Sequence, residues 1–367
     1  MRAALAASAR GGRPLRYAAS EAVLRAALGP RGARAARQAV AAAPGPGLRR
    51  RAYRTAWEDA AGAAGAALED LGHGLLRLTR GGRSVQVRDG IVPLDDPVAL
   101  AVAGDRELAH EALRRAGLAV PRAVRCTTAD LGPARRLLAE TGRVVVKPAA
   151  GTGAGTAVTC GVGTPDELVR AAVYAARWGG DVVVEEQVQG EEARVLVLDG
   201  RPLGTVRRRP PEVVGDGRSS VAELVVAENA RRTAAGGAAG LLPLTLDLDA
   251  VATLRRAGRR LHGVPPAGAV WPVKTAVNQA GPAQTAGERG AVGALAGVAT
   301  AAAGALGLRL AAVEVVQHPG SGAVVLEVNS TPGLHYHWQV AEDSEAVLVC
   351  RDLLDALLRQ PDRRESP

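Results

Sequence analysis

The 367-residue chain contains no phenylalanine and only eight aromatic side chains, four Trp and four Tyr. Proteins that bind single-stranded nucleic acid stack bases on exposed aromatic rings, so this shortage argues against that class despite a formal net charge of +9. The arginines are scattered along the chain, which favours a solvated basic surface that attracts anionic substrates such as nucleotides. We therefore expect no nucleic-acid partner, and keep a basic nucleic-acid-binding protein as the alternative.

Cysteine and long apolar runs are also scarce. Cys126, Cys160 and Cys350 lie far apart without C-x-x-C spacing, which indicates neither a disulfide framework nor a zinc site. No apolar run approaches the ~18 residues of a membrane span, and residues 1–20 lack the continuous apolar core of a signal peptide. We expect a cytoplasmic protein with no membrane partner. A hydrophobic content of 47% over this length predicts two or three globular domains.

Lysine and asparagine are rare in this chain. The two lysines are Lys147 and Lys274, and the three asparagines are Asn229, Asn278 and Asn329, whereas arginine supplies 44 of the 46 basic residues. Such a bias is typical of a GC-rich genome, under which Lys and Asn persist where their chemistry is needed. Four of these five residues fall in segments that the motifs below assign to one site.

Two β-branched apolar runs, 309–316 and 324–333, predict an antiparallel hairpin. If Gly320 and Ser321 form a two-residue turn, Glu314 and Glu327 lie opposite each other, with Asn329 on the same face. Directly opposed carboxylates destabilise a sheet, and a hard cation with oxygen ligands removes the conflict. The hairpin therefore predicts a metal site for Mg²⁺, with Mn²⁺ as an alternative ion. A surface hairpin whose acids pair with arginines is the other interpretation.

A second motif follows the strand predicted at 144–146. Lys147 ends this strand, and Gly151, Gly153 and Gly155 follow it. An ammonium group and backbone N–H groups of this kind can surround phosphoryl oxygens. The spacing matches neither G-x-x-x-x-G-K-[ST] nor G-x-G-x-x-G, and a flexible hairpin loop is the alternative.

The remaining patterns indicate a mixture of helices and β-hairpins. We expect the following elements: helices at 105–117, 165–176, 284–307 and 344–358, a strand at 182–184, a hairpin with an Asp199-Gly200 turn, and a helix opened by the capping box Ser220 to Glu223.

With these motifs in order, residues 95–358 resemble the ATP-grasp superfamily. The segments VVVKP, VVVEEQVQGEEARVLVLDGR, RRPPEVVGDGRSSVAELV and LEVNSTPGL are most similar to the carboxylate-amine ligase branch of cyanophycin synthetase, with glutathione synthetase and D-alanine-D-alanine ligase as further relatives. The resemblance implies an α/β fold class: an ATP-grasp fold of α+β subdomains with an N-terminal α/β domain. The implied domains are 1–97, 98–184 and 185–367, and the first is a candidate for substrate recognition.

The resemblance also implies residue roles. The residues implied to hold ATP are Arg106, Lys147, Gly151, Gly153, Gly155, Glu185, Glu186, Gln187, Val188, Glu192 and Asn278. Among them, 185–188 match the segment whose backbone reads adenine, and Glu192 matches the acid that binds ribose. Glu314, Glu327 and Asn329 match the metal ligands. The implied catalytic residues are Arg194, Arg208 and Lys274, and the substrate candidates are Gly333 and His335.

The implied reaction is amide-bond formation between a carboxylate, from an amino acid or peptide, and an amine. ATP phosphorylates the carboxylate, the amine attacks the acylphosphate, and ADP and phosphate leave. Because the chain lacks the additional large domain of cyanophycin synthetase, we expect a single addition, with homopolymer formation as the alternative. A nucleotide-binding protein without turnover is the alternative from another class, and a homodimer is one assembly open to the chain.

Overall fold

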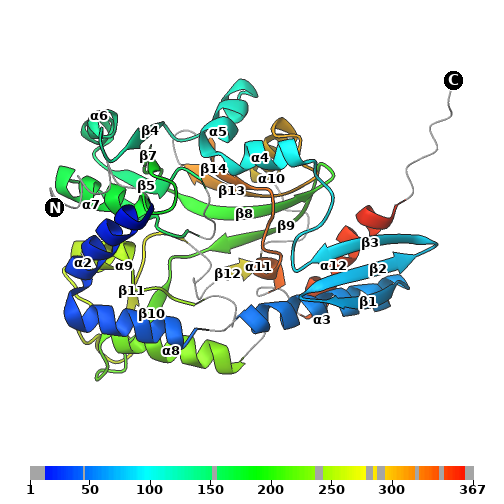
Figure 1. The fold of residues 1–367 in the computed structure, drawn as a ribbon, viewed down its shortest axis with the longest axis horizontal. Coiled ribbons are helices and arrows are strands. Elements are labelled where there is room, and N and C mark those ends of the chain that lie inside the picture. The colour runs from blue at the N-terminus through cyan, green and yellow to red at the C-terminus, as the bar shows by residue number, and fades with distance from the viewer. Residues whose placement is uncertain are drawn as a thin grey trace.

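The computed structural model describes residues 13–43, 46–150, 155–235, 243–277, 284–286, 294–318, 322–338 and 343–359. Helices and antiparallel sheets alternate along this part of the chain, so the predicted mixed α and β class is confirmed. Two of the sheets carry the candidate site, one with four strands and one with five (Figure 1).

The four-stranded sheet has the order β4-β7-β5-β6, and its neighbouring strands are antiparallel. Its strands are β4 (Ala123–Thr127), β7 (Asp181–Glu186), β5 (Val144–Pro148) and β6 (Thr159–Val162). Helices α6 (Gly132–Thr141) and α7 (Pro165–Ala175) bury the face that carries Val144, Val146 and Val184. Because side chains alternate along a strand, Val145 and Lys147 point to the opposite face.

The five-stranded sheet has the order β12-β9-β8-β13-β14. Its strands are β12 (Gln284–Ala286), β9 (Arg201–Arg208), β8 (Glu191–Leu198), β13 (Leu310–His318) and β14 (Gly322–Asn329). Helices α4 (Pro97–Gly104), α5 (Arg106–Arg115) and α10 (Ala294–Ala305) cover one face, above a valine-rich core (Figure 1). The other face is divided: Leu196 and Leu310 are in a hydrophobic core, whereas Arg194 and Glu314 line a cleft.

The N-terminal residues pack into cores that they share with later parts of the chain. Helix α2 (Arg13–Ala41) contributes Val23 to the core of the four-stranded sheet, and it also packs near α8 (Val221–Ala235) and α9 (Leu248–Arg256). Helix α3 (Pro46–Ala64) and strands β1 (Ala67–Gly72), β2 (Leu75–Arg80) and β3 (Arg83–Arg88) share a core with α12 (Asp343–Leu358). Thus the expected boundary at 97 does not separate two cores, and the expected boundary at 184 falls inside β7.

Several local predictions hold. Asp199 and Gly200, with φ of 48° and 72°, form the tight turn between β8 and β9. Ser220 and Glu223 exchange the hydrogen bonds of a capping box at the start of α8. The helix expected at 284–307 is wrong at its start, because 284–286 form β12 against β9 and the described helix α10 begins at Ala294.

The predicted pairing of Glu314 with Glu327 in the β13–β14 hairpin is confirmed, but the turn that was assumed does not produce it. Glu314 pairs with Glu327 as expected, but His318 pairs with Gly322, which the two-residue turn at Gly320 and Ser321 does not allow. A β-bulge reconciles the two pairings, because Leu326 is an extra residue that opposes no partner of its own. Residues 319–321 lie outside the described part of the chain.

The remaining described elements are β10 (Glu212–Val214), β11 (Val270–Pro272) and α11 (His335–Trp338). Among the described helices, none combines the length and the apolar character needed to cross a bilayer. The three cysteines are buried as free thiols.

Candidate active site

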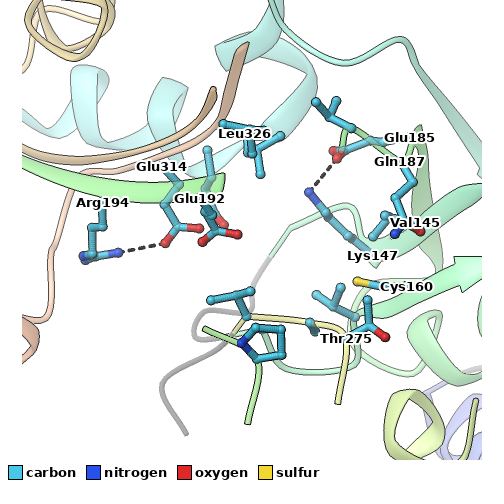
Figure 2. Close-up of a pocket in the computed structure, with 18 of the residues that line it drawn as sticks. Val145, Lys147, Cys160, Glu185, Gln187, Glu192, Arg194, Thr275, Glu314 and Leu326 are labelled. Carbon is cyan, nitrogen blue, oxygen red and sulfur yellow. Dashed lines mark hydrogen bonds and ion pairs between the residues drawn. The ribbon is translucent and has the colours of Figure 1, made fainter. Parts of the chain in front are cut away.

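A cleft of about 1090 Å³ lies between the four-stranded and five-stranded sheets. Figure 2 shows Val145, Lys147, Glu185 and Gln187 on one wall, and Glu192, Arg194 and Glu314 on the other. Of the predicted site residues, the following line this cleft: Lys147, Gly155, Glu185, Glu186, Gln187, Val188, Glu192, Arg194, Glu314, Glu327, Asn329 and Gly333. Segments far apart in sequence thus meet at one place.

Lys147 is held by an ion pair on the first wall. Its Nζ lies 2.5 Å from Glu185 Oε2, and its side chain is 12% exposed. Burial is the largest single influence and lowers the pKa of Lys147, but Glu185 and Glu327 together outweigh it and the pKa is raised. Burial raises the pKa of Glu185, and Lys147 reverses this too. Lys147 is therefore a cation at neutral pH, with its ammonium group at the cleft.

The opposite wall carries two adjacent carboxylates with an arginine on each side. Arg194 pairs with Glu314 across β8 and β13, with a nitrogen–oxygen distance of 2.8 Å. Glu314 faces Glu327 across β13 and β14, and Arg106 of α5 lies 3.1 Å from Glu327. Each acid thus has an arginine partner, so the ion-paired interpretation of the hairpin is correct in part. The hairpin is nevertheless a cleft wall rather than a free surface.

The donor set at this wall fits a hard divalent cation. No three His, Cys, Asp or Glu residues converge anywhere in the described part of the chain, so a metal here would rest on Glu314, Glu327 and an amide. Asn329 supplies that amide: its Nδ2 lies 3.4 Å from Glu314 Oε1, and half a turn of the amide brings its oxygen to the same place. Two carboxylates completed by phosphate oxygens and water are a usual Mg²⁺ set.

The segment between β7 and β8 crosses the cleft. Glu186 accepts from Arg122, and Gln187 Oε1 accepts from Gly161 N at 2.6 Å, which fixes the segment to neighbouring backbone. Gly190 has a φ of +147°, and a Cβ there would lie 2.3 Å from the Gln317 carbonyl oxygen. This approach requires glycine, and it sets the position of Glu192 at the start of β8.

Lys274 is not in the cleft, contrary to the prediction. Its side chain is 1% exposed, and its Nζ lies 2.5 Å from Asp247 Oδ2 and 3.0 Å from Thr245 Oγ1. Thr275 and Ala276, the next two residues, do line the cleft. The sequence placed the segment correctly, but the lysine side chain turns the other way because it has a buried acid as its partner.

His335 is buried rather than open to a substrate. It is 0% exposed, and its Nδ1 lies 2.9 Å from the hydroxyl oxygen of Tyr53. Burial, Arg49 and Arg194 lower the pKa of His335 to about 3, so the ring is neutral. The His335 side chain is therefore not among the residues that line the cleft, whereas Gly333, two residues earlier, does line the cleft.

Arg106 contacts Glu327 and lines a side chamber of about 170 Å³ beside Glu327 and Asn329. Gly151, Gly153 and Asn278 lie outside the described residues, as does the side chain of Arg208. Several cleft residues were not predicted from the sequence: Arg49, Cys160, Thr275 and Leu326. Asp249 was also missed, although its buried carboxylate accepts from the backbone of Cys160, Thr275 and Ala276 and thereby joins two parts of the cleft wall.

Comparisons with known proteins agree with the sequence resemblance. No protein-family model matches the chain. Cyanophycin synthetase of Nostoc sp. is 32% identical over 136 residues, which cover 37% of this chain and 15% of that protein. The glutathione biosynthesis bifunctional protein GshAB of Pasteurella multocida is 33% identical over 138 residues, 37% of this chain and 18% of that one. A solved bifunctional glutathione synthetase from Pasteurella multocida aligns at a TM-score of 0.49 with 22% identity, covering 80% of this chain and 42% of that chain.

The predicted resemblance to cyanophycin synthetase and to glutathione-forming proteins is confirmed by these matches. The match spans less than a fifth of the length of either curated relative.

Proposed function

We propose that this chain is an ATP-dependent carboxylate-amine ligase of the ATP-grasp type, which forms an amide bond through an acylphosphate and releases ADP and phosphate. The observation that carries the proposal is the pair of facing walls: a buried, cationic Lys147 on one side, and two opposed carboxylates with Asn329 on the other. The sequence similarity to cyanophycin synthetase and GshAB supports the same chemistry.

On the first wall, Lys147 would bind phosphate oxygens of ATP. Its ammonium group is charged and carries three N–H donors, so it can bind phosphate oxygens while it keeps the ion pair with the buried Glu185. Gly155 lies beside it at the cleft, at the end of the glycine-rich segment. The backbone of residues 186–188 would contact the adenine base, and Glu192 the ribose hydroxyls.

On the second wall, Glu314, Glu327 and Asn329 would hold Mg²⁺. When bound, the ion neutralises charge on the transferred phosphoryl group. Arg194 and Arg106, which now neutralise the two acids, lie at hydrogen-bond distance from them. When a cation replaces them as the acids' partner, these guanidinium groups can turn to anionic substrate oxygens. Arg208 remains a second candidate for that role.

The reaction then depends mainly on position and charge. A substrate carboxylate held near Arg194 would attack the terminal phosphorus atom, and the resulting acylphosphate would be attacked by the amine with loss of phosphate. The enclosure of the site between two sheets would limit hydrolysis of that intermediate.

The proposal is tested by assaying ADP, AMP and phosphate with Mg²⁺-ATP and paired amino acids or short peptides. We expect ADP and phosphate in equal amounts, dependent on the carboxylate substrate, and a hydroxamate when hydroxylamine replaces the amine. Stoichiometric AMP and pyrophosphate would overturn the acylphosphate route. The product mass distinguishes a single addition from repeated addition.

A further inference from the structure

A small apolar patch lies in the cleft, on the side of the four-stranded sheet. Its members pack together and line the cleft: Val145, Val158, Cys160 and Ala276 (Figure 2). Gln187 Oε1 accepts a hydrogen bond from the backbone N–H of Gly161, so the patch adjoins the segment that crosses the cleft between β7 and β8. A ligand that contacts this segment therefore also lies beside the patch.

Strand β6, which carries Cys160, lies at the edge of its sheet. Among the described strands only β5 pairs with it, and a strand edge leaves backbone N–H and C=O groups that need other partners. At Cys160 both partners are side chains of α9. The N–H donates to Asp249 Oδ1 at 2.8 Å, and the carbonyl oxygen accepts from Arg256 Nη1 at 2.9 Å. Helix α9 thus takes the place of a neighbouring strand at this edge.

The same two side chains hold the segment that supplies Ala276. Asp249 Oδ2 accepts from the backbone N–H groups of Thr275 and Ala276 at 3.0 Å and 2.9 Å. Arg256 Nη2 donates to the Thr275 hydroxyl group at 2.7 Å. Asp249 and Arg256 lie about two helical turns apart, so both project from one face of α9. One helix face therefore fixes Cys160 and Ala276 relative to each other.

The Arg256 guanidinium fits closely against Gly161. Its Nη1 also donates to the Gly161 carbonyl oxygen at 3.3 Å. Gly161 has a φ of +67°, and a Cβ there would lie 2.6 Å from Arg256 Cζ. Asp249 is 0% exposed, and neither it nor Arg256 is among the described residues that line the cleft. Both residues therefore act on a ligand only through the backbone that they hold.

We propose that Asp249 and Arg256 are positioning residues for the nucleobase, because they set the shape of the apolar patch on which the base packs. The inference rests on the proposed function, in which residues 186–188 contact adenine, and it adds residues outside the cleft that control this contact. Burial of apolar surface contributes in proportion to the area removed from water, so a shift of Cys160 relative to Ala276 weakens binding of the base. A purine has a larger face than a pyrimidine and loses more contact when the patch is displaced.

The test compares two non-hydrolysable triphosphate analogues, one of adenosine and one of uridine, by isothermal titration calorimetry in the presence of Mg²⁺. Both carry the same ribose and phosphate groups, so the ratio of their affinities reports on the base. We expect the wild type to bind the adenosine analogue more tightly, by about tenfold or more. Arg256→Gln should lower that affinity about fivefold, the effect of one hydrogen bond, and change the affinity for the uridine analogue by about twofold or less.

Further variants distinguish positioning from general stability. Asp249→Asn should reduce the preference for the adenosine analogue further, because an amide offers one acceptor oxygen to three N–H groups. Arg256→Lys should restore part of the loss. Arg255→Gln is the matched control, since Arg255 is the next residue on α9 and is exposed like Arg256, and it should bind both analogues as the wild type does.

Three results would overturn the positioning role: equal losses for both analogues in Arg256→Gln, unchanged affinities in both Arg256→Gln and Asp249→Asn, or a wild type without preference for adenosine. If neither analogue binds to the wild type, the proposed function is rejected as well. Nucleotide binding without ADP formation would reject the ligase reaction and leave the positioning result standing.

Discussion

The two lysines of this chain form the same kind of ion pair in two different places. Lys147 and Glu185 approach to 2.5 Å at the cleft wall, and Lys274 and Asp247 approach to 2.5 Å in the interior. In both pairs burial lowers the pKa of the lysine, but two nearby acids together raise it above its ordinary value: Glu185 and Glu327 for Lys147, and Asp247 and Asp249 for Lys274. The difference is access, because Lys147 is 12% exposed at the cleft and Lys274 is 1% exposed.

This difference separates a structural ion pair from one that can take a further partner. Lys274 also contacts Thr245, and Asp247 also caps α9, so every group in that pair serves the fold. Lys147 can donate a further hydrogen bond to a ligand in the cleft while it stays paired with Glu185. Scarcity of lysine therefore indicates that each lysine is retained for a reason, but it does not say whether the reason is stability or chemistry.

The largest expected effect is on stability at the interior pair. We expect Lys274→Met to lower the free energy of unfolding by about 3–5 kcal/mol, because the buried Asp247 and Asp249 both lose the cation that compensates them. The double variant Lys274→Met/Asp247→Asn should recover part of the loss, since Asn still caps α9 and Asp249 keeps its backbone hydrogen bonds. Urea unfolding of all three proteins measures this. A single variant as stable as the wild type would mean that the interior pair contributes nothing.

At the cleft pair, the largest effect should be on turnover. We expect Lys147→Met to reduce ADP formation on the order of 100-fold, the usual loss for one preorganised electrostatic contact. In Lys147→Met/Glu185→Gln, stability should recover while turnover stays low, which is the opposite of a purely structural pair. Initial rates and urea unfolding on the same samples separate the two. If turnover recovers together with stability, the two lysine pairs have the same role.

The acidic wall extends the comparison to carboxylates. We expect Glu327→Gln to raise the Mg²⁺ concentration needed for half-maximal turnover at least tenfold, with a stability loss under ~1 kcal/mol, because Glu327 is 29% exposed. Glu111→Gln removes an acid that also pairs with arginine, but on the surface of α5, and serves as the control. If both variants show the same dependence on Mg²⁺ concentration, Glu327 does not bind the metal and only forms an ion pair with arginine.

The remaining expected effect concerns His335, a buried titratable group that is neutral. In the unfolded chain His335 takes up a proton as the pH falls through about 6.5, whereas the folded ring stays neutral down to about 3. Stability is therefore lost as the pH falls, by about 2 kcal/mol between pH 7 and pH 5. Both lysines stay charged over this range.

Urea unfolding of the wild type and of His335→Gln at pH 7 and pH 5 measures the histidine contribution. The variant should lose about 2 kcal/mol less than the wild type on acidification, and a residual slope from His110, whose pKa burial also lowers, should remain. Identical slopes in the two proteins would show that His335 is accessible to protons in the fold.

Much of the fold could be predicted because its signals are local. Alternating apolar residues and the turn at Asp199 and Gly200 predicted β8, β9, β13 and β14, and the capping box predicted the start of α8, whereas β12 was expected to be helix. The facing of Glu314 and Glu327 was also predictable, although the assumed turn was wrong and a bulge restores the pairing.

The rest depends on contacts between distant segments. The sequence could place residues 274–277 beside the cleft, but it could not show that Asp247 draws Lys274 inward. Arg49 is one of 44 arginines, and the helix that carries it is placed by long-range contacts, such as those of Tyr53 with His335 and Leu334 and the core shared with α12. The packing of α2 and α3 into cores shared with later segments also depends on such distant contacts. It could not be predicted, because these alanine-rich helices have little hydrophobic periodicity.

The bulge at Leu326 has a consequence for insertions and deletions. Val325 and Val328 lie in the core beneath α10, so without Leu326 the usual alternation would still turn Glu327 toward the cleft and Val328 toward the core. The extra residue is therefore unnecessary for the pairing of the two acids. It adds a leucine side chain in the cleft (Figure 2) and a backbone hydrogen bond to the buried His110. A chain shortened by this residue should fold with the carboxylates still opposed, and it should lose an apolar contact surface and the His110 contact. Length variation at this point would then alter what the cleft binds and leave its acidic wall intact.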